Sequence, residues 1–79
     1  MLDTVIDPDS ALPPYEQLAV ILRDEIAQGF LTGKVPSVHD ISEHHGVSHR
    51  VAQRALSVLE GEGLIVSVPG EGHFVHKRG

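Results

Sequence analysis

The amino-acid sequence predicts one α+β domain in which three helices are followed by a two-stranded antiparallel hairpin. Three observations predict this fold class. The chain has 79 residues, which is enough for one domain and leaves no length for a second. Apolar residues recur at three- and four-residue spacing in three segments that glycine and proline separate. Beyond the third segment, two short apolar runs flank a Pro-Gly turn.

The first helix is expected to begin near Tyr15 and to end near Gly29. Pro13 and Pro14 cannot lie inside a helix but can open one, so residues 1–12 are expected to form an extended arm. The apolar residues that then recur at helical spacing, with charged and amide side chains between them, are Leu18, Ile21, Leu22, Ile26 and Phe30.

Two N-cap signals predict the second and third helices. Ser37 stands three residues before an acidic side chain, the spacing of a capping serine and a favourable first-turn charge. Ser48 repeats the capping signal just after Gly46, which suits the left-handed end of a helix. We therefore expect helices over about 38–45 and 49–60, joined by about three residues, which is the spacing of a helix-turn-helix.

A strand, a turn and a second strand are expected at 64–68, 69–72 and 73–76. A further, very short strand is expected near Lys34 and Val35. A helix-turn-helix followed by a hairpin is a winged helix-turn-helix, in which the hairpin is the wing. The predicted division is an N-terminal arm at 1–12, a winged helix-turn-helix DNA-binding domain at 13–76, and a tail or the start of a linker at 77–79.

Composition excludes several classes of protein. The chain has no cysteine, so it forms no disulfide and offers no thiolate to a metal. Its longest apolar runs are a few residues, against the roughly 20 that span a bilayer. The acidic N-terminus lacks the positive charge and apolar stretch of a secretory signal. We expect a cytoplasmic protein that makes no contact with a membrane.

The net charge has the wrong sign for a protein that binds phosphates, being −5 at pH 7. Residues 1–30 hold six of the eleven acidic side chains and one of the six basic ones. Residues 31–79 are balanced and hold all six histidines. The acidic and the titratable parts of the chain are therefore separate, and mild acid adds positive charge to the second part.

The third helix carries the side chains that suit a DNA interface. A helix-turn-helix places the N-terminal part of its second helix in the major groove, where arginine bonds guanine and glutamine bonds adenine. Arg50, Gln53 and Arg54 suit this task, although periodicity alone is equally consistent with ordinary solvated helix residues. Ser37 and Ser48 stand at helix starts, where a hydroxyl either donates to phosphate or only caps the helix.

The predicted wing has residues that favour contact with DNA and one that opposes it. Gly70 and Gly72 permit close approach of the backbone to DNA, but Glu71 between them has the same charge sign as phosphate. His73 and Lys77 are the better candidates for contacts from this hairpin. A plain hairpin that only closes the core is the alternative.

These residues together resemble the N-terminal DNA-binding domain of the GntR family of bacterial transcription regulators, from about residue 6 to 75. The matching pieces are Pro14-Tyr15-Glu16-Gln17-Leu18, Pro36-Ser37, Gly46-Val47-Ser48, Ala55-Leu56, Leu59-Glu60-Gly61-Glu62-Gly63-Leu64-Ile65, and Gly70-x-Gly72-x-Phe74-Val75. The resemblance implies a homodimer on a palindromic operator, with repression by promoter occlusion as the default mechanism. It also implies a small-molecule effector only where a C-terminal domain follows.

The sequence departs from the family pattern at the expected DNA contacts. Where the family usually has basic residues, this chain has His39, His49 and Glu71. The usual threonine and arginine further along the recognition helix are replaced by Val51 and Gln53. The basic side chains that remain are Lys34 and Arg54, with Arg50 beside its usual position.

Four histidines invite a metal-site reading, since imidazole binds zinc, copper and nickel; they are His39, His44, His45 and His49. The last two are four residues apart, but the turn at Gly46 separates them, so they do not share a helical face. We prefer the hypothesis that His39 and His49 replace permanent charges by titratable ones, so that DNA affinity rises as the pH falls from 7.5 to 6.

No nucleophile, base and orienting carboxylate stand at a supporting spacing, so we expect neither enzyme activity nor a cofactor. The predicted function is sequence-specific binding of double-stranded DNA in transcription regulation. The alternative is a winged-helix module that binds another protein through its acidic first helix. The salt dependence of binding distinguishes the two functions, because affinity for DNA falls steeply as added salt supplies competing counterions.

Overall fold

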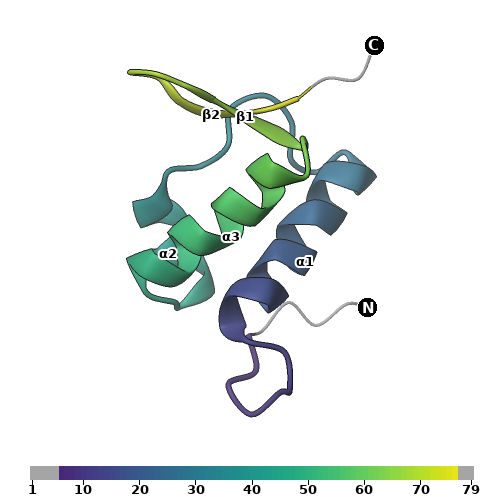
Figure 1. Ribbon diagram of the computed structural model, residues 1–79, viewed down its shortest axis with the longest axis vertical. Coiled ribbons are helices and arrows are strands. Elements are labelled where there is room, and N and C mark those ends of the chain that lie inside the picture. Colours follow the sequence, from purple (N-terminus) through teal and green to yellow (C-terminus); the bar gives the residue numbers. More distant parts are fainter. Residues whose placement is uncertain (1–5, 77–79) are drawn as a thin grey trace.

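Five regular elements follow one another along residues 6–76, the part of the chain that the computed structural model describes. Three helices are followed by a two-stranded antiparallel hairpin, which confirms the predicted winged-helix order. Figure 1 shows the hairpin lying over the helices. The elements are α1 (Pro14–Gln28), α2 (Val38–His45), α3 (His49–Gly61), β1 (Ile65–Val68) and β2 (Gly72–Val75). In the hairpin Val66 pairs with Phe74, which is half-buried, and Val68 pairs with Gly72.

Both predicted serine caps are present. The Ser37 hydroxyl accepts a hydrogen bond from the backbone N–H of Asp40 at 3.1 Å, and Ser48 accepts one from Val51 at 3.1 Å. Gly46 ends α2 in the left-handed region, with φ at 66°, where a side chain would be strained. Gly46 and the Ser48 cap fix the turn between α2 and α3 and therefore the direction in which α3 leaves it.

The core forms where α3 packs against α1, α2 and β1. The buried residues of α3 are two alanines and two leucines, and the small side chains of Ala52 and Ala55 let the helices approach closely. The loop residue Val35 closes the core from the hairpin side. The buried apolar residues are Leu18, Ala19, Leu22, Val35, Ile41, Ala52, Ala55, Leu56, Leu59 and Ile65.

The loop between α1 and α2 adds a third edge to the wing. Lys34 forms an isolated antiparallel bridge with Phe74, so one bridge stands where a very short strand was predicted. The N–H of Val35 donates to the carbonyl of His73 at 2.9 Å, and the N–H of Val75 donates to the carbonyl of Gly33 at 2.7 Å. The hairpin is therefore held to the body of the domain through backbone pairing.

An ion pair joins α1 to the end of α3. Arg23 donates from Nε and Nη2 to the two carboxylate oxygens of Glu62, at 2.9 and 2.7 Å. The hydrogen bond from Arg23 lowers the pKa of the Glu62 carboxyl below its ordinary value. This bidentate contact fixes the turn from which the wing emerges.

Residues 7–12 are bent and not extended as predicted, and residues 1–5 of the predicted arm lie outside the described residues. Gln17 in α1 accepts from the N–H of Asp7 and donates to the carbonyls of Asp7 and Leu12, all at 2.7 Å. One amide side chain therefore closes residues 7–12 into the loop seen at the foot of Figure 1. No helix within residues 6–76 is long and apolar enough to cross a membrane.

Replacing Leu59 by alanine is predicted to lower the free energy of unfolding by about 2–5 kcal/mol, because Leu59 is fully buried on α3 and the substitution leaves a cavity. Urea unfolding followed by circular dichroism measures this change. Val20→Ala is the matched control, because Val20 is 48% exposed in α1 and its truncation should change stability by less than about 0.5 kcal/mol. Equal effects of the two substitutions would contradict the core assignment.

Candidate nucleic-acid interface

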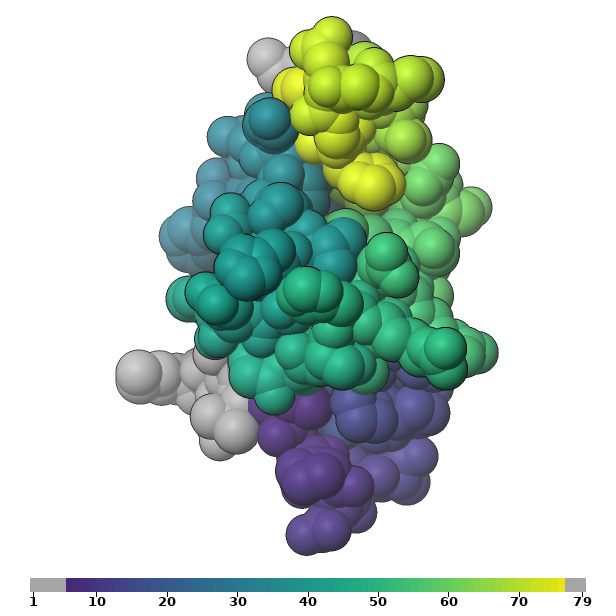
Figure 2. All heavy atoms as spheres, turned by 90° about the vertical axis from the view of Figure 1, so that its left-hand side faces the viewer, coloured from purple at the N-terminus to yellow at the C-terminus, as the bar shows by residue number. Residues whose placement is uncertain are grey.

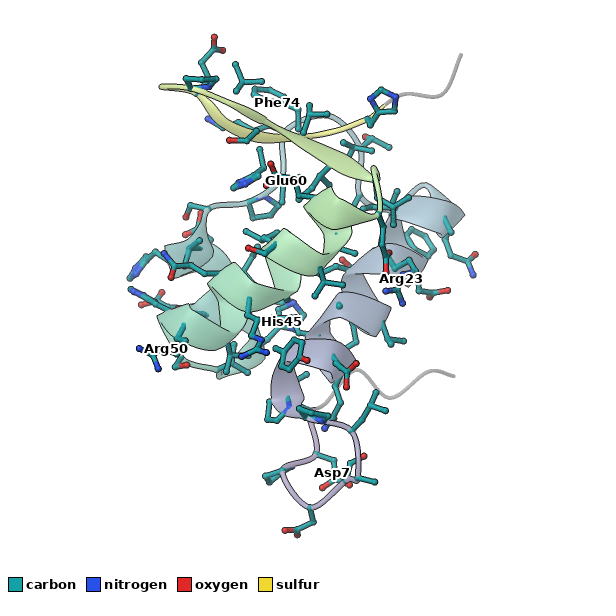
Figure 3. All side chains as sticks on the ribbon, in the orientation of Figure 1. Asp7, Arg23, His45, Arg50, Glu60 and Phe74 are labelled. Atoms are coloured by element: carbon teal, nitrogen blue, oxygen red, sulfur yellow. The ribbon has the colours of Figure 1, made fainter. Side chains whose placement is uncertain are left out.

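The exposed face of α3 lies opposite its buried stripe. Arg50, Gln53, Arg54 and Ser57 are exposed, whereas the stripe of alanine and leucine faces the core. Figure 3 shows Arg50 pointing away from the body of the domain, at the N-terminal end of α3. Figure 2 shows this side of the molecule, with α2 and the start of α3 at its centre and the wing above them. A duplex that takes α3 in its major groove would meet this surface.

Two histidines, one at the start of α2 and one at the start of α3, lie against each other. The rings of His39 and His49 lie edge to face with their centroids 5.6 Å apart. His39 Nε2 is also 3.3 Å from a carboxylate oxygen of Glu43, one turn along α2. Ser37 and Ser48 cap these same two helix starts, so four of the predicted contact residues form one cluster. The phosphate contacts predicted for this cluster remain a proposal.

Arg50 and Arg54 differ from Arg23 in their surroundings. Within residues 6–76 neither has a carboxylate within 4 Å, whereas Arg23 is bound to Glu62. The guanidinium carbon of Arg54 instead lies 4.3 Å from the centroid of the Tyr15 ring. Nothing in the sequence marks Tyr15 as a functional residue, because 39 positions separate it from Arg54 and only the packing of α1 on α3 brings them together.

The wing places charges of both signs near its tip. Glu71 is exposed at the turn between the strands. Lys34 reaches the same place from the neighbouring edge, because a Cβ atom at Gly72 would meet its Cε at 3.7 Å. Gly72 has φ at 113°, so a side chain there would be strained as well as close to Lys34. Lys34, Gly70 and Gly72 therefore form a second cluster, on the wing.

His73 faces the body of the domain. It is half-buried, and its Nε2 lies 3.5 Å from a carboxylate oxygen of Glu60 in α3. A groove between the wing and the helices is lined by Val38, Gln53, Leu56, Ser57 and His73. Gln53 of α3 and His73 of β2 thus line the same groove. Lys77 lies outside the described residues.

Two further histidines, His44 and His45, lie together at the end of α2. His44 and His45 stack edge to face with their ring centroids 4.8 Å apart. Within the described part of the chain, no group of three or more histidine, aspartate or glutamate side chains is arranged to hold a metal ion. Burial lowers the pKa of His45 below its ordinary value, and the neighbouring His44 lowers it further, while Glu25 of α1 acts in the opposite direction.

Residues 14–75 match the model of the GntR family, described as bacterial regulatory proteins. The chain belongs to this family. The match begins at the first residue of α1 and ends at the last residue of β2, so it covers every regular element of the fold. The resemblance seen in the sequence is thereby confirmed.

Three similar proteins illustrate the range of the GntR family. The chain is 41% identical over 66 residues to the uncharacterized HTH-type transcriptional regulator YjiR of Escherichia coli (strain K12), covering 81% of this chain and 14% of YjiR. It is 35% identical over 74 residues to the HTH-type transcriptional repressor NagR of Bacillus subtilis (strain 168), covering 91% of this chain and 30% of NagR. The crystal structure of AraR(DBD) in complex with operator ORX1 is similar with a TM-score of 0.79 and 30% identity, covering 96% of this chain and 93% of that one. The chain thus spans 14% to 30% of the length of the two curated relatives.

Acid is predicted to destabilise the fold through His45. Because burial lowers the pKa of His45 in the folded state, the unfolded chain takes up the proton at a higher pH than the folded domain does. The contribution of neutral His45 to stability is complete above the unfolded-state pKa of about 6.5 and is lost as the pH falls from there. Urea unfolding at a series of pH values should show this decline, and His45→Gln should flatten it.

An NMR titration of the His45 ring tests directly whether its pKa is lowered in the folded domain. Its midpoint should lie below the midpoint measured for histidine in the chain unfolded in urea. A midpoint at or above that of the unfolded chain contradicts the assignment, whatever the stability measurements show.

Proposed function

We propose that this chain is a sequence-specific double-stranded DNA-binding module that acts in transcription repression. The observation that carries the proposal is the exposed, positively charged face of α3, which follows a helix-turn-helix turn with Gly46 as the C-cap of α2 and Ser48 as the N-cap of α3. Membership of the GntR family and similarity to a DNA-binding domain crystallised with an operator support it. α3 would lie in the major groove, with Arg50 and Gln53 at base edges.

The other predicted residues would contact the DNA backbone. Ser37, His39, Ser48 and His49 stand at the starts of α2 and α3, where backbone N–H groups and the helix dipole favour phosphate. Lys34 and the wing glycines would approach the adjacent groove. His73, which faces Glu60, would hold the wing in position more than it would touch DNA.

The finer parts of the proposal concern assembly. A palindromic operator requires two copies of α3 related by a two-fold axis, so we propose that the chain acts as a homodimer on DNA. Repression would follow from occlusion of a promoter by this dimer. A small-molecule effector enters only where a C-terminal domain accompanies the module.

A second candidate function rests on the charge of the chain. Glu71 at the wing tip and the net charge of −5 both oppose binding to phosphate. A winged-helix module of this kind would instead bind a protein through the acidic face of α1. Its affinity for that protein would not change when exposed residues of α3 are substituted.

Arg50→Ala is predicted to weaken binding to DNA and to reduce discrimination between sequences. Selection from a randomised duplex library should first enrich a palindromic site for the unmodified protein. Affinity for that site should fall about five- to 150-fold in the variant, since one base contact is worth about 1–3 kcal/mol. Gln28→Ala, at the end of α1, is the matched control and should leave the affinity unchanged. No enrichment and no salt-dependent binding would favour the protein-binding alternative.

DNA affinity is predicted to rise as the pH falls from 7.5 to 6. Protonation of His39 and His49 would add positive charge to the cluster at the helix starts, where phosphate is proposed to bind. Fluorescence anisotropy at constant ionic strength measures the change, and replacing both histidines by glutamine should remove it. An affinity that is flat across this range in the unmodified protein refutes the hypothesis.

A further inference from the structure

We propose that Tyr15 is a positioning residue that holds Arg54 as a clamp for a DNA phosphate beside the groove occupied by α3. This inference rests on the proposed function and assigns Arg54 a role different from that of Arg50. Its basis is the stack of the Arg54 guanidinium on the Tyr15 ring, with 4.3 Å between guanidinium carbon and ring centroid.

The chemistry of the stack leaves Arg54 able to bind an anion. A carboxylate partner neutralises an arginine and occupies its N–H groups, as Glu62 does for Arg23. An aromatic ring touches only the flat face of the guanidinium, so the positive charge and the N–H groups at its edge remain available. Within residues 6–76 no carboxylate lies within 4 Å of Arg54. The stack therefore orients the side chain without consuming its charge.

The position of the stack points to the DNA backbone. Arg50 is the second residue of α3 and projects outward, whereas Arg54 stands one turn later and leans onto the second residue of α1. A helix in the major groove has the phosphates of the two strands along its flanks, so a side chain that leaves the helix sideways meets phosphate and not base edges. A guanidinium drawn from α3 towards α1 therefore reaches the phosphate backbone at the edge of the groove. Arg50 would read sequence, and Arg54 would supply affinity for any sequence.

Preorganisation is the contribution expected of Tyr15. A free arginine side chain loses conformational freedom when it binds phosphate, and a side chain already held on a ring loses less. An exposed cation–π contact favours the held conformation by a factor of about two to five. Removing the ring should therefore weaken DNA binding by about that factor, and only when Arg54 is present.

A double-mutant cycle with a mixed-sequence duplex tests the coupling. Tyr15→Leu should weaken binding about two- to fivefold, Tyr15→Phe should retain the affinity, and Tyr15→Leu should have no further effect in Arg54→Ala protein. Log affinity falls with log salt concentration, and in Arg54→Ala protein the slope should be less negative by about 0.9 because one phosphate contact is lost. It should also weaken binding to a selected operator and to the mixed-sequence duplex by the same factor.

Three results would overturn the proposal. Equal effects of Tyr15→Leu with and without Arg54 would make Tyr15 a structural residue only. A loss in Arg54→Ala protein confined to the selected operator would make Arg54 a base reader. No effect of Tyr15→Leu in a protein that binds DNA through Arg50 would refute this inference alone, whereas absence of any DNA binding would refute the proposed function itself.

A measurement on the unmodified protein covers the case in which Tyr15→Leu does not fold. The Hδ protons of Arg54 should show an upfield ring-current shift from Tyr15 in the NMR spectrum, and they should keep it when DNA is added. The Nε–Hε signal of Arg54 should move on the same addition. Loss of the ring-current shift on binding would show that Arg54 leaves the ring to reach DNA, which contradicts the proposal.

Discussion

The burial of one stripe of α3 is the constraint on which the rest of this structure depends. Ala55 and Leu59 are fully excluded from solvent, and α3 reaches α1, α2 and β1 through this stripe. In a helix the 3.6-residue period sets the direction of every side chain around the axis. Burial of this stripe therefore also determines which side chains project outward. The orientation of Arg50, Gln53 and Arg54 is thus a consequence of core packing, and hydrophobic burial is what presents them to a partner.

Some basic side chains lie beside a carboxylate, and others do not. Arg23 binds Glu62, while His39 and His73 lie beside Glu43 and Glu60, so several carboxylates of the second half of the chain lie next to a basic group. Arg54 rests on an aromatic ring, which does not neutralise it. Net charge therefore describes this domain poorly, since the local arrangement leaves positive side chains exposed on a chain whose sum is negative.

Local signals in the sequence predicted the fold well, because caps, turns and hairpins are encoded by neighbouring residues. Ser48 and its partner Val51 are three positions apart, and that spacing was readable without a structure. Contacts between distant segments were not readable. Nothing near Arg23 indicated Glu62, and nothing near Tyr15 indicated Arg54, because these pairs arise only when α1 packs on α3. The candidate DNA-contact residues were predicted from the sequence as a set, but their arrangement in space depends on the packing of the helices and the wing.

The wing shows how backbone pairing can determine where a side-chain charge acts. The N–H of Val35 and the carbonyl of Gly33 bond to β2, and this pairing carries Lys34 to the side of Gly72. A lysine in the loop between two helices thereby stands beside the tip of a hairpin far from it in sequence. Glu71 at that tip opposes phosphate, and Lys34 supplies a charge of the opposite sign to the same region. The local charge of the wing thus depends on both the loop and the hairpin, and neither segment specifies it alone.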